Sequence, residues 1–172
     1  MTPAAVYVDQ IRADLGPAWL PRLYRERILK MRTRSYQFPP LPRKTDPAIH
    51  HTLLGVELKA GRRRMLCPDL ATARYLAVFA RIGCRAVAIP YDITRISFAA
   101  DELESSWHRM LLLTQTAAAD RKAPFRARLR HQLIAKVREE IDEAGAGAAR
   151  PQFNQSTRQK LRAAAKTAKG NS

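Results

Sequence analysis

Residues 52–92 read TLLGVELKAGRRRMLCPDLATARYLAVFARIGCRAVAIPYD and carry an unbroken succession of secondary-structure signals. In the first eight residues Leu54, Val56 and Leu58 fall on one face and Leu53, Gly55, Glu57 and Lys59 on the other, which is the period-two pattern of a half-buried strand. Ala60-Gly61 then predicts a turn, and residues 62–67 are expected to return as the partner strand. The start of this stretch therefore predicts a β-hairpin.

A helix and a third strand are expected to follow the hairpin. Pro68 ends the second strand, Asp69 stands where an N-cap belongs, and Gly83 stands where a C′ residue belongs. Residues 70–82 between them are therefore predicted to be helical. Residues 85–89 are a short apolar run, which is typical of a strand that is covered on both faces.

Together these signals predict a small α/β or α+β domain. Its sheet is expected to consist of the hairpin, a crossover helix and the third strand, with helices packed on it and basic helical extensions at both ends. Composition divides the chain into five parts. These are a basic helical segment (1–34), a proline-rich linker or arm (35–51), the α/β core (52–118), a basic amphipathic helix (119–143), and a flexible hinge with a basic tail (144–172).

The charge of the chain is strongly positive and unevenly distributed. There are 31 Lys and Arg against 15 Asp and Glu, a formal net charge of +16. Residues 1–45 carry 9 basic and 3 acidic side chains, residues 46–120 carry 9 and 8, and residues 121–172 carry 13 and 4. A nearly neutral centre with two cationic flanks is the pattern expected of a protein that faces a polyanion.

Nucleic acid, either DNA or RNA, is the partner that these flanks favour. Neutralisation of phosphates by Lys and Arg releases condensed counterions, so binding needs no particular sequence motif. An aromatic side chain in the proline-rich arm is a candidate for stacking on bases. The predicted contacts are Arg22, Arg25, Arg32, Arg34, Arg126, Arg128, Arg130, Arg158, Lys160 and Arg162 to phosphates, and Tyr36 to bases.

Other features bound the compartment and the cofactors. Two cysteines, Cys67 and Cys84, are too few for a disulfide framework or a four-ligand zinc site. The sequence shows no signal-peptide pattern and no apolar run of about 20 residues. We therefore expect an intracellular protein, cytoplasmic or nucleoid-associated, that does not bind membranes. Its oligomeric state is left open.

A second candidate site lies at Glu57-Leu-Lys59. An acid, any residue and a lysine near the end of a strand, with Asp46 on the preceding segment and a helix and strand following, is similar to the PD-(D/E)XK nuclease core. The resemblance covers residues 46–90. It implies that Asp46 and Glu57 hold Mg²⁺ or Mn²⁺ and that Lys59 orients or deprotonates the attacking water.

The same residues have a purely structural interpretation. If Ala60-Gly61 is a two-residue turn, Glu57 faces Arg64 across the hairpin as an ordinary cross-strand ion pair. A third function class is an assembly or adaptor protein whose arginines or proline arm dock on an acidic protein. Without nuclease activity no cofactor is expected.

Overall fold

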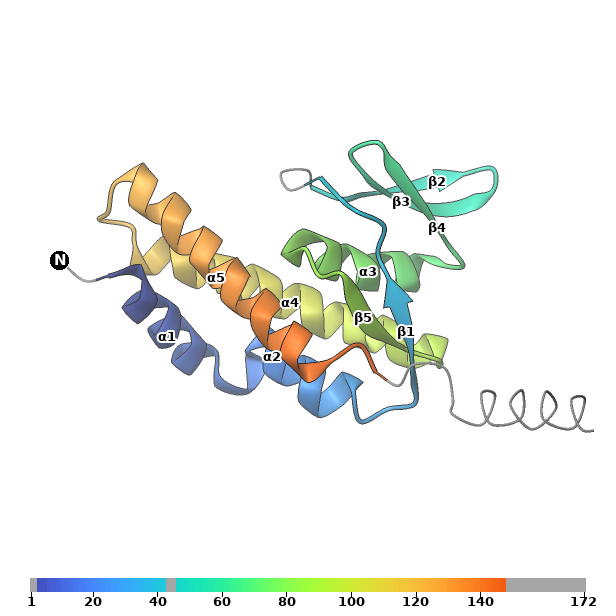
Figure 1. Ribbon diagram of the computed structural model, residues 1–172, viewed down its shortest axis with the longest axis horizontal. Coiled ribbons are helices and arrows are strands. Elements are labelled where there is room, and N and C mark those ends of the chain that lie inside the picture. The colour runs from blue at the N-terminus through green and yellow to red at the C-terminus, as the bar shows by residue number, and fades with distance from the viewer. Residues whose placement is uncertain (1–2, 43–45, 148–172) are drawn as a thin grey trace, which may run out of the picture.

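The computed structural model of the protein describes residues 3–42 and 46–147 (Figure 1). The helical elements are α1 (Ala4–Leu15), the 3₁₀ turn η1 (Gly16–Ala18), α2 (Leu20–Leu23), the π-helical turn η2 (Tyr24–Ile28), α3 (Leu70–Ile82), α4 (Ile93–Ala117) and α5 (Ala123–Ala144). The strands are β1 (Thr33–Gln37), β2 (Ala48–Thr52), β3 (Gly55–Ala60), β4 (Arg63–Cys67) and β5 (Ala86–Pro90). The predicted α+β fold class is confirmed.

The strands form two separate antiparallel sheets, and this corrects the predicted topology. β2, β3 and β4 make a three-stranded meander, whereas β5 pairs with β1 and not with the hairpin. Both β1 and β2 draw on residues 35–51, which were predicted as a linker or arm. Only residues 38–42 and 46–47 in the described part of that segment lie outside strands. The prolines interrupt pairing locally, and the residues on either side still donate backbone hydrogen bonds.

The second edge of β5 is closed by two tyrosine side chains. The backbone N–H of Ala88 donates to the hydroxyl of Tyr24 at 2.9 Å, and the hydroxyl of Tyr75 donates to the carbonyl of Ala88 at 2.5 Å. Tyr24 in turn donates to the carbonyl of Gly145 at 2.5 Å. Because these hydroxyls satisfy the outward groups of Ala88, β5 needs no further strand on that side.

The β3–β4 turn also differs from the prediction by one residue. Gly61 and Arg62 form the loop, with Ala60 paired to Arg63 and Lys59 to Arg64. Primed hairpin turns require a positive φ at their first loop position, and Gly61 has φ 61°. A turn at Ala60-Gly61 would have forced an alanine into that conformation, which its Cβ disfavours.

One hydrophobic cluster extends from Ala4 to Ile141. Ile11 and Leu15 of α1 and Leu129 of α5 are buried in it. The helices predicted as N- and C-terminal extensions therefore pack in the core. The β2–β3–β4 sheet lies over α3 (Figure 1) and buries the inner-face side chains of β3 and β4, including a completely buried Leu58. Across the described residues, no helix combines the length and apolarity that a bilayer crossing demands.

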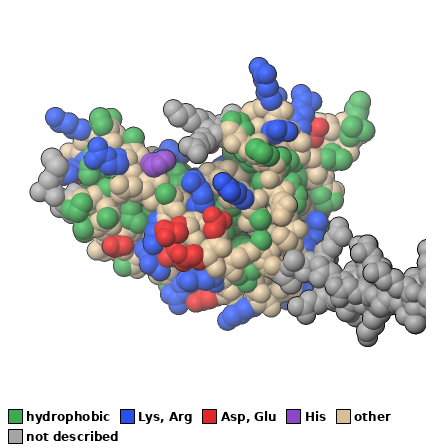
Figure 2. Space-filling view, in the orientation of Figure 1, with side chains coloured by type: hydrophobic (Ala, Val, Ile, Leu, Met, Phe, Trp, Pro, Cys, Tyr) green, Lys and Arg blue, Asp and Glu red, His purple; other side chains and the backbone are tan. Residues whose placement is uncertain are grey.

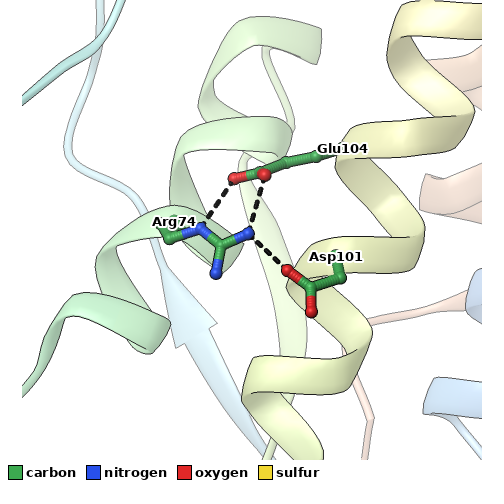
Figure 3. Close-up of polar contacts among 3 residues, drawn as sticks. All are labelled: Arg74, Asp101 and Glu104. Atoms are coloured by element: carbon green, nitrogen blue, oxygen red, sulfur yellow. Dashed lines mark hydrogen bonds and ion pairs between the residues drawn. The ribbon is translucent and has the colours of Figure 1, made fainter.

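α3 and α4 are joined by an arginine clamp (Figure 3). The guanidinium of Arg74 donates to both carboxylate oxygens of Glu104, at 3.2 and 2.8 Å, and to Asp101 at 2.6 Å. These hydrogen bonds, first that to Glu104, raise the pKa of Arg74 above its ordinary value. The clamp uses two of the acids of the central segment and thereby keeps them away from the arginines of the flanks.

Candidate nucleic-acid interface

Three groups of cations lie on the surface of the described residues. The hairpin cations are Lys59, Arg62, Arg63 and Arg64 around the β3–β4 turn. The α5 arginines are Arg126, Arg128 and Arg130. The junction arginines are Arg25 on η2, Arg32 between η2 and β1, and Arg34 on β1.

The hairpin cations include a like-charge pair. The register of β3 and β4 sets Lys59 directly opposite Arg64, on the face of the sheet that points away from α3. Arg62, Arg63 and Arg64 are exposed, and none of the hairpin cations forms an ion pair within the described residues. Like charges directly opposite each other destabilise a sheet. Figure 2 shows Lys and Arg side chains gathered over this sheet.

The order of charges along α5 is the reverse of the order that the helix dipole favours. Its N-terminal part carries the three α5 arginines, whereas the acids Glu139, Glu140, Asp142 and Glu143 lie near its C-terminus. Figure 2 shows acidic side chains gathered over that end. The macrodipole favours the opposite order, with each well-placed charge contributing about 0.3–1 kcal/mol. The arrangement instead adds side-chain charge to the positive end of the helix dipole.

The α5 arginines do not share one face. Arg126 and Arg130 are four residues apart and lie on the same side of the helix. Arg128 is two residues from each and therefore points roughly 160° away, at about 100° per residue. One phosphate strand can thus contact Arg126 and Arg130 together. Arg128 is reached only from the opposite side of the helix.

Arg22 and Arg25 take part in an open hollow between α1 and η2. Its volume is about 640 Å³, and Arg12, Trp19 and one acid, Asp9, also line it. Arg22 forms an ion pair with Glu26 at 2.9 Å, one turn along the same helical segment. Exposed pairs of this kind contribute about 0.3–0.5 kcal/mol, so the hollow keeps cationic groups that an anion can reach.

The acids are mostly occupied elsewhere. Asp69 and Asp92 cap α3 and α4 by accepting from Thr72 and Thr94. The remaining ion pairs among the described residues join Arg12 to Glu140, Arg27 to Glu102, Arg74 to Asp101 and Glu104, and Lys136 to Glu139. Among the predicted phosphate contacts that the structure describes, Arg22 alone forms an ion pair.

Tyr36 is less accessible than the sequence suggested. It packs edge to face with Phe38, with 5.0 Å between ring centroids, and both lie against the hydrophobic core. The pKa of Tyr36 is raised, and the largest cause is burial of its side chain. Tyr91, which lies beside Arg32, is more accessible than Tyr36, with 47% of its surface exposed. In the sequence, the only signal that pointed to Tyr91 as a functional residue was its position directly after a predicted strand.

The predicted catalytic residues lie on or next to the three-stranded sheet. Glu57 and Lys59 share the outer face of β3, and Asp46 is exposed two residues before β2. The predicted pairing of Glu57 with Arg64 is wrong, because Glu57 faces Leu66 on β4 and His50 on β2.

Two observations bear on the nuclease resemblance. No group of three or more His, Cys, Asp and Glu side chains within residues 3–42 and 46–147 is arranged to hold a metal ion. The strand that the resemblance sets after the helix, β5, belongs to the other sheet. The assignment of Asp46, Glu57 and Lys59 as catalytic residues, with Asp46 and Glu57 as metal ligands, stays a prediction. The tail contacts Arg158, Lys160 and Arg162 lie outside the described residues.

Comparison of the chain with protein-family models, with curated proteins and with solved structures finds no match. Function is therefore inferred from the geometry and charge of the chain itself.

Proposed function

We propose that this protein binds nucleic acid through the phosphate backbone. The hairpin cations, the α5 arginines and the junction arginines supply the contacts. The observation that carries the proposal is the pair of half-buried Lys59 and exposed Arg64, two like charges held opposite each other with no acid directly across from either on the adjoining strands. Glu57 lies two residues from Lys59 on the same face of β3. Such a like-charge pair weakens the free protein and becomes favourable when a phosphate lies between the two cations.

The reversed charge order of α5 supports the same conclusion. Neither the Lys59–Arg64 pair nor the charge order of α5 stabilises the fold. Both concentrate positive potential at the surface of the protein. Arginine predominates in all three groups, and its planar guanidinium suits bidentate contact with phosphate oxygens. Recognition of this kind reads the backbone and gives little preference for sequence.

Fluorescence anisotropy with labelled duplex DNA, single-stranded DNA and duplex RNA tests the proposal. The logarithm of the binding constant is expected to fall linearly with the logarithm of salt concentration. The double variant Arg126→Gln/Arg130→Gln should lower the slope of that line by about two, and Arg64→Gln by about one.

Lys136→Gln is the matched control, since Lys136 lies on the same helix but pairs with Glu139 at 3.6 Å. Its salt slope should stay within experimental error of the wild-type value. Affinities that do not change with salt, or a control that loses as much as the arginine variants, would contradict the proposal.

The two other function classes stay open as proposals with tests of their own. For a metal-dependent nuclease, plasmid, single strands and RNA would be cleaved with Mg²⁺ or Mn²⁺, and Glu57→Ala would abolish cleavage. For an adaptor, a pull-down after nuclease treatment would still retain one stoichiometric acidic protein. Each result is independent of the salt titration above.

A further inference from the structure

β5 leads into α4 beside the start of β1 (Figure 1), and this part of the chain carries two exposed aromatic residues. Tyr91 is 47% exposed and Phe98 is 65% exposed. The buried face of α4 is formed by other residues, including Ile96, Ala99 and Leu103. Full burial of a phenylalanine contributes about 1.5–3 kcal/mol, and Phe98 forgoes most of that contribution. The fold itself therefore gives no reason for a large aromatic residue there.

Arg32 and Tyr91 form a pre-arranged stack. The guanidinium carbon of Arg32 lies 5.1 Å from the centroid of the Tyr91 ring. The backbone N–H of Tyr91 donates to the carbonyl of Arg32 at 3.2 Å and extends the β1–β5 ladder by one more pair. The two side chains are thus held next to each other by the sheet, and little conformational entropy remains to be lost on binding.

Further cations lie close by in the chain. Arg95 is exposed three residues before Phe98 on α4, so the two occupy neighbouring positions on the helix surface. Arg34 is exposed on β1, two residues after Arg32 and therefore on the same face of that strand. Planar groups and cations thus follow one another within eight residues of the chain, from Tyr91 to Phe98, and the β1–β5 ladder sets Arg32 beside the start of that segment.

We propose that Tyr91, Phe98 and Arg32 form a stacking platform for unpaired nucleobases, with Arg34 and Arg95 contacting the phosphates of the same strand. The inference rests on the proposed function and specifies its substrate class. Bases within a duplex are stacked on each other and cannot offer their faces, whereas bases of a single strand or loop can. The platform therefore selects single-stranded over double-stranded nucleic acid.

The charge around the platform favours a nucleic acid strand over an apolar protein surface as its ligand. A hydrophobic partner would have to cover Arg32, Arg34 and Arg95 without compensating their charge, since none of them forms an ion pair within the described part of the chain. A nucleic acid strand brings both the flat apolar faces and the negative charge.

The experiment uses the full chain and a thymidine oligonucleotide with one 2-aminopurine, alongside a duplex of the same length. Tyr91→Ala and Phe98→Ala should each weaken single-strand binding by about five- to a hundred-fold and leave duplex affinity unchanged. Wild-type protein should change the 2-aminopurine fluorescence, which reports stacking directly, and this change should be lost in both variants.

Leu112→Ala is the matched control, because Leu112 is another large apolar residue on α4, 61% exposed, that the platform does not include. It should bind both substrates as the wild type does. Circular dichroism of each variant excludes a loss of fold. Single-strand affinity unchanged in Tyr91→Ala and Phe98→Ala, or lost equally for the duplex, would overturn the platform and leave the salt-dependent function standing. Absence of binding to every nucleic acid would overturn both.

Discussion

The indole N–H of Trp19 donates a hydrogen bond to the carboxylate of Glu140, 121 residues away in the sequence. Glu140 is only 7% exposed, and its other oxygen accepts from Arg12 at 2.8 Å. One carboxylate therefore ties α1 and the segment after it to α5. Since both partners depend on it, removal of this carboxylate leaves a buried indole N–H without an acceptor.

Glu140→Ala is expected to lower the free energy of unfolding by about 2–4 kcal/mol. The variant loses a buried charged acceptor, and Trp19 and Arg12 are left without the group to which they donate. Urea unfolding followed by circular dichroism measures this directly. Glu139→Ala is the control: its side chain is 59% exposed and the change should stay within about 0.5 kcal/mol. Equal effects of the two variants would contradict the structural role of Glu140.

The β3–β4 turn gives a prediction about backbone conformation. Gly61→Ala should destabilise the protein by about 1–2 kcal/mol, because alanine at φ 61° brings its Cβ close to the following carbonyl. Gly61→Asn should cost less, since asparagine tolerates the left-handed region. Unfolding free energies of the two variants check the order, and an alanine variant as stable as the asparagine variant would refute it.

The same turn shows what the sequence can and cannot predict. The hairpin, the α3 helix with Asp69 as N-cap and the C′ glycine Gly83 all follow from local signals, and the structure confirms them. The register of the hairpin depends on which residue takes the positive φ, and a one-residue error changes every cross-strand neighbour. The pairing of Lys59 with Arg64 was therefore out of reach.

Long-range pairing was also missed. Residues 33–37 show no alternation of apolar and polar side chains. They form β1 because they pair with the edge of the buried strand β5. The arginines predicted as phosphate contacts are exposed wherever the structure describes them, because charged side chains seldom enter a core. The stack of Arg32 on Tyr91 joins residues 59 positions apart, and no local signal connects them.

Arg64→Gln should change stability and binding in opposite directions. Removal of one charge from the pair with Lys59 is expected to stabilise the free protein by a few tenths of a kcal/mol at low salt. The gain should vanish near 1 M salt, where screening shortens the range of the repulsion to about 3 Å. Urea unfolding at both salt concentrations gives the stability, and the anisotropy titration gives the loss of affinity. A destabilised Arg64→Gln at low salt would show that Arg64 has a structural role.

The α3–α4 clamp predicts that lysine cannot replace arginine at position 74. Arg74→Lys keeps the charge but cannot donate to Asp101 and to both oxygens of Glu104 at once. We expect a loss of about 1–2 kcal/mol of unfolding free energy. Arg109→Lys, on α4 and exposed, is the comparison variant and should be neutral. A neutral Arg74→Lys would reduce the clamp to a simple ion pair.

Stability should fall in alkaline solution because two buried acids resist ionisation in the native state. Burial, followed by the nearby Asp142, raises the pKa of Cys84 from 9.0 to about 12. Burial likewise raises the pKa of Tyr24 from 10.0 to about 12. Above pH 9 the unfolded chain therefore releases protons that the folded chain keeps, so the unfolding free energy decreases as pH rises from 9 to 12 and is unaffected by these groups below pH 9.

Cys84→Ala separates the thiol from the other groups that titrate in this range. The variant loses stability at pH 7 because a buried side chain is shortened. Its unfolding free energy should then fall less steeply than that of the wild type between pH 9 and 12, since one of the buried acids with a raised pKa is gone. Urea midpoints at pH 7, 9 and 10.5 measure both slopes. Parallel curves would mean that Cys84 ionises as readily in the folded chain as in the unfolded one.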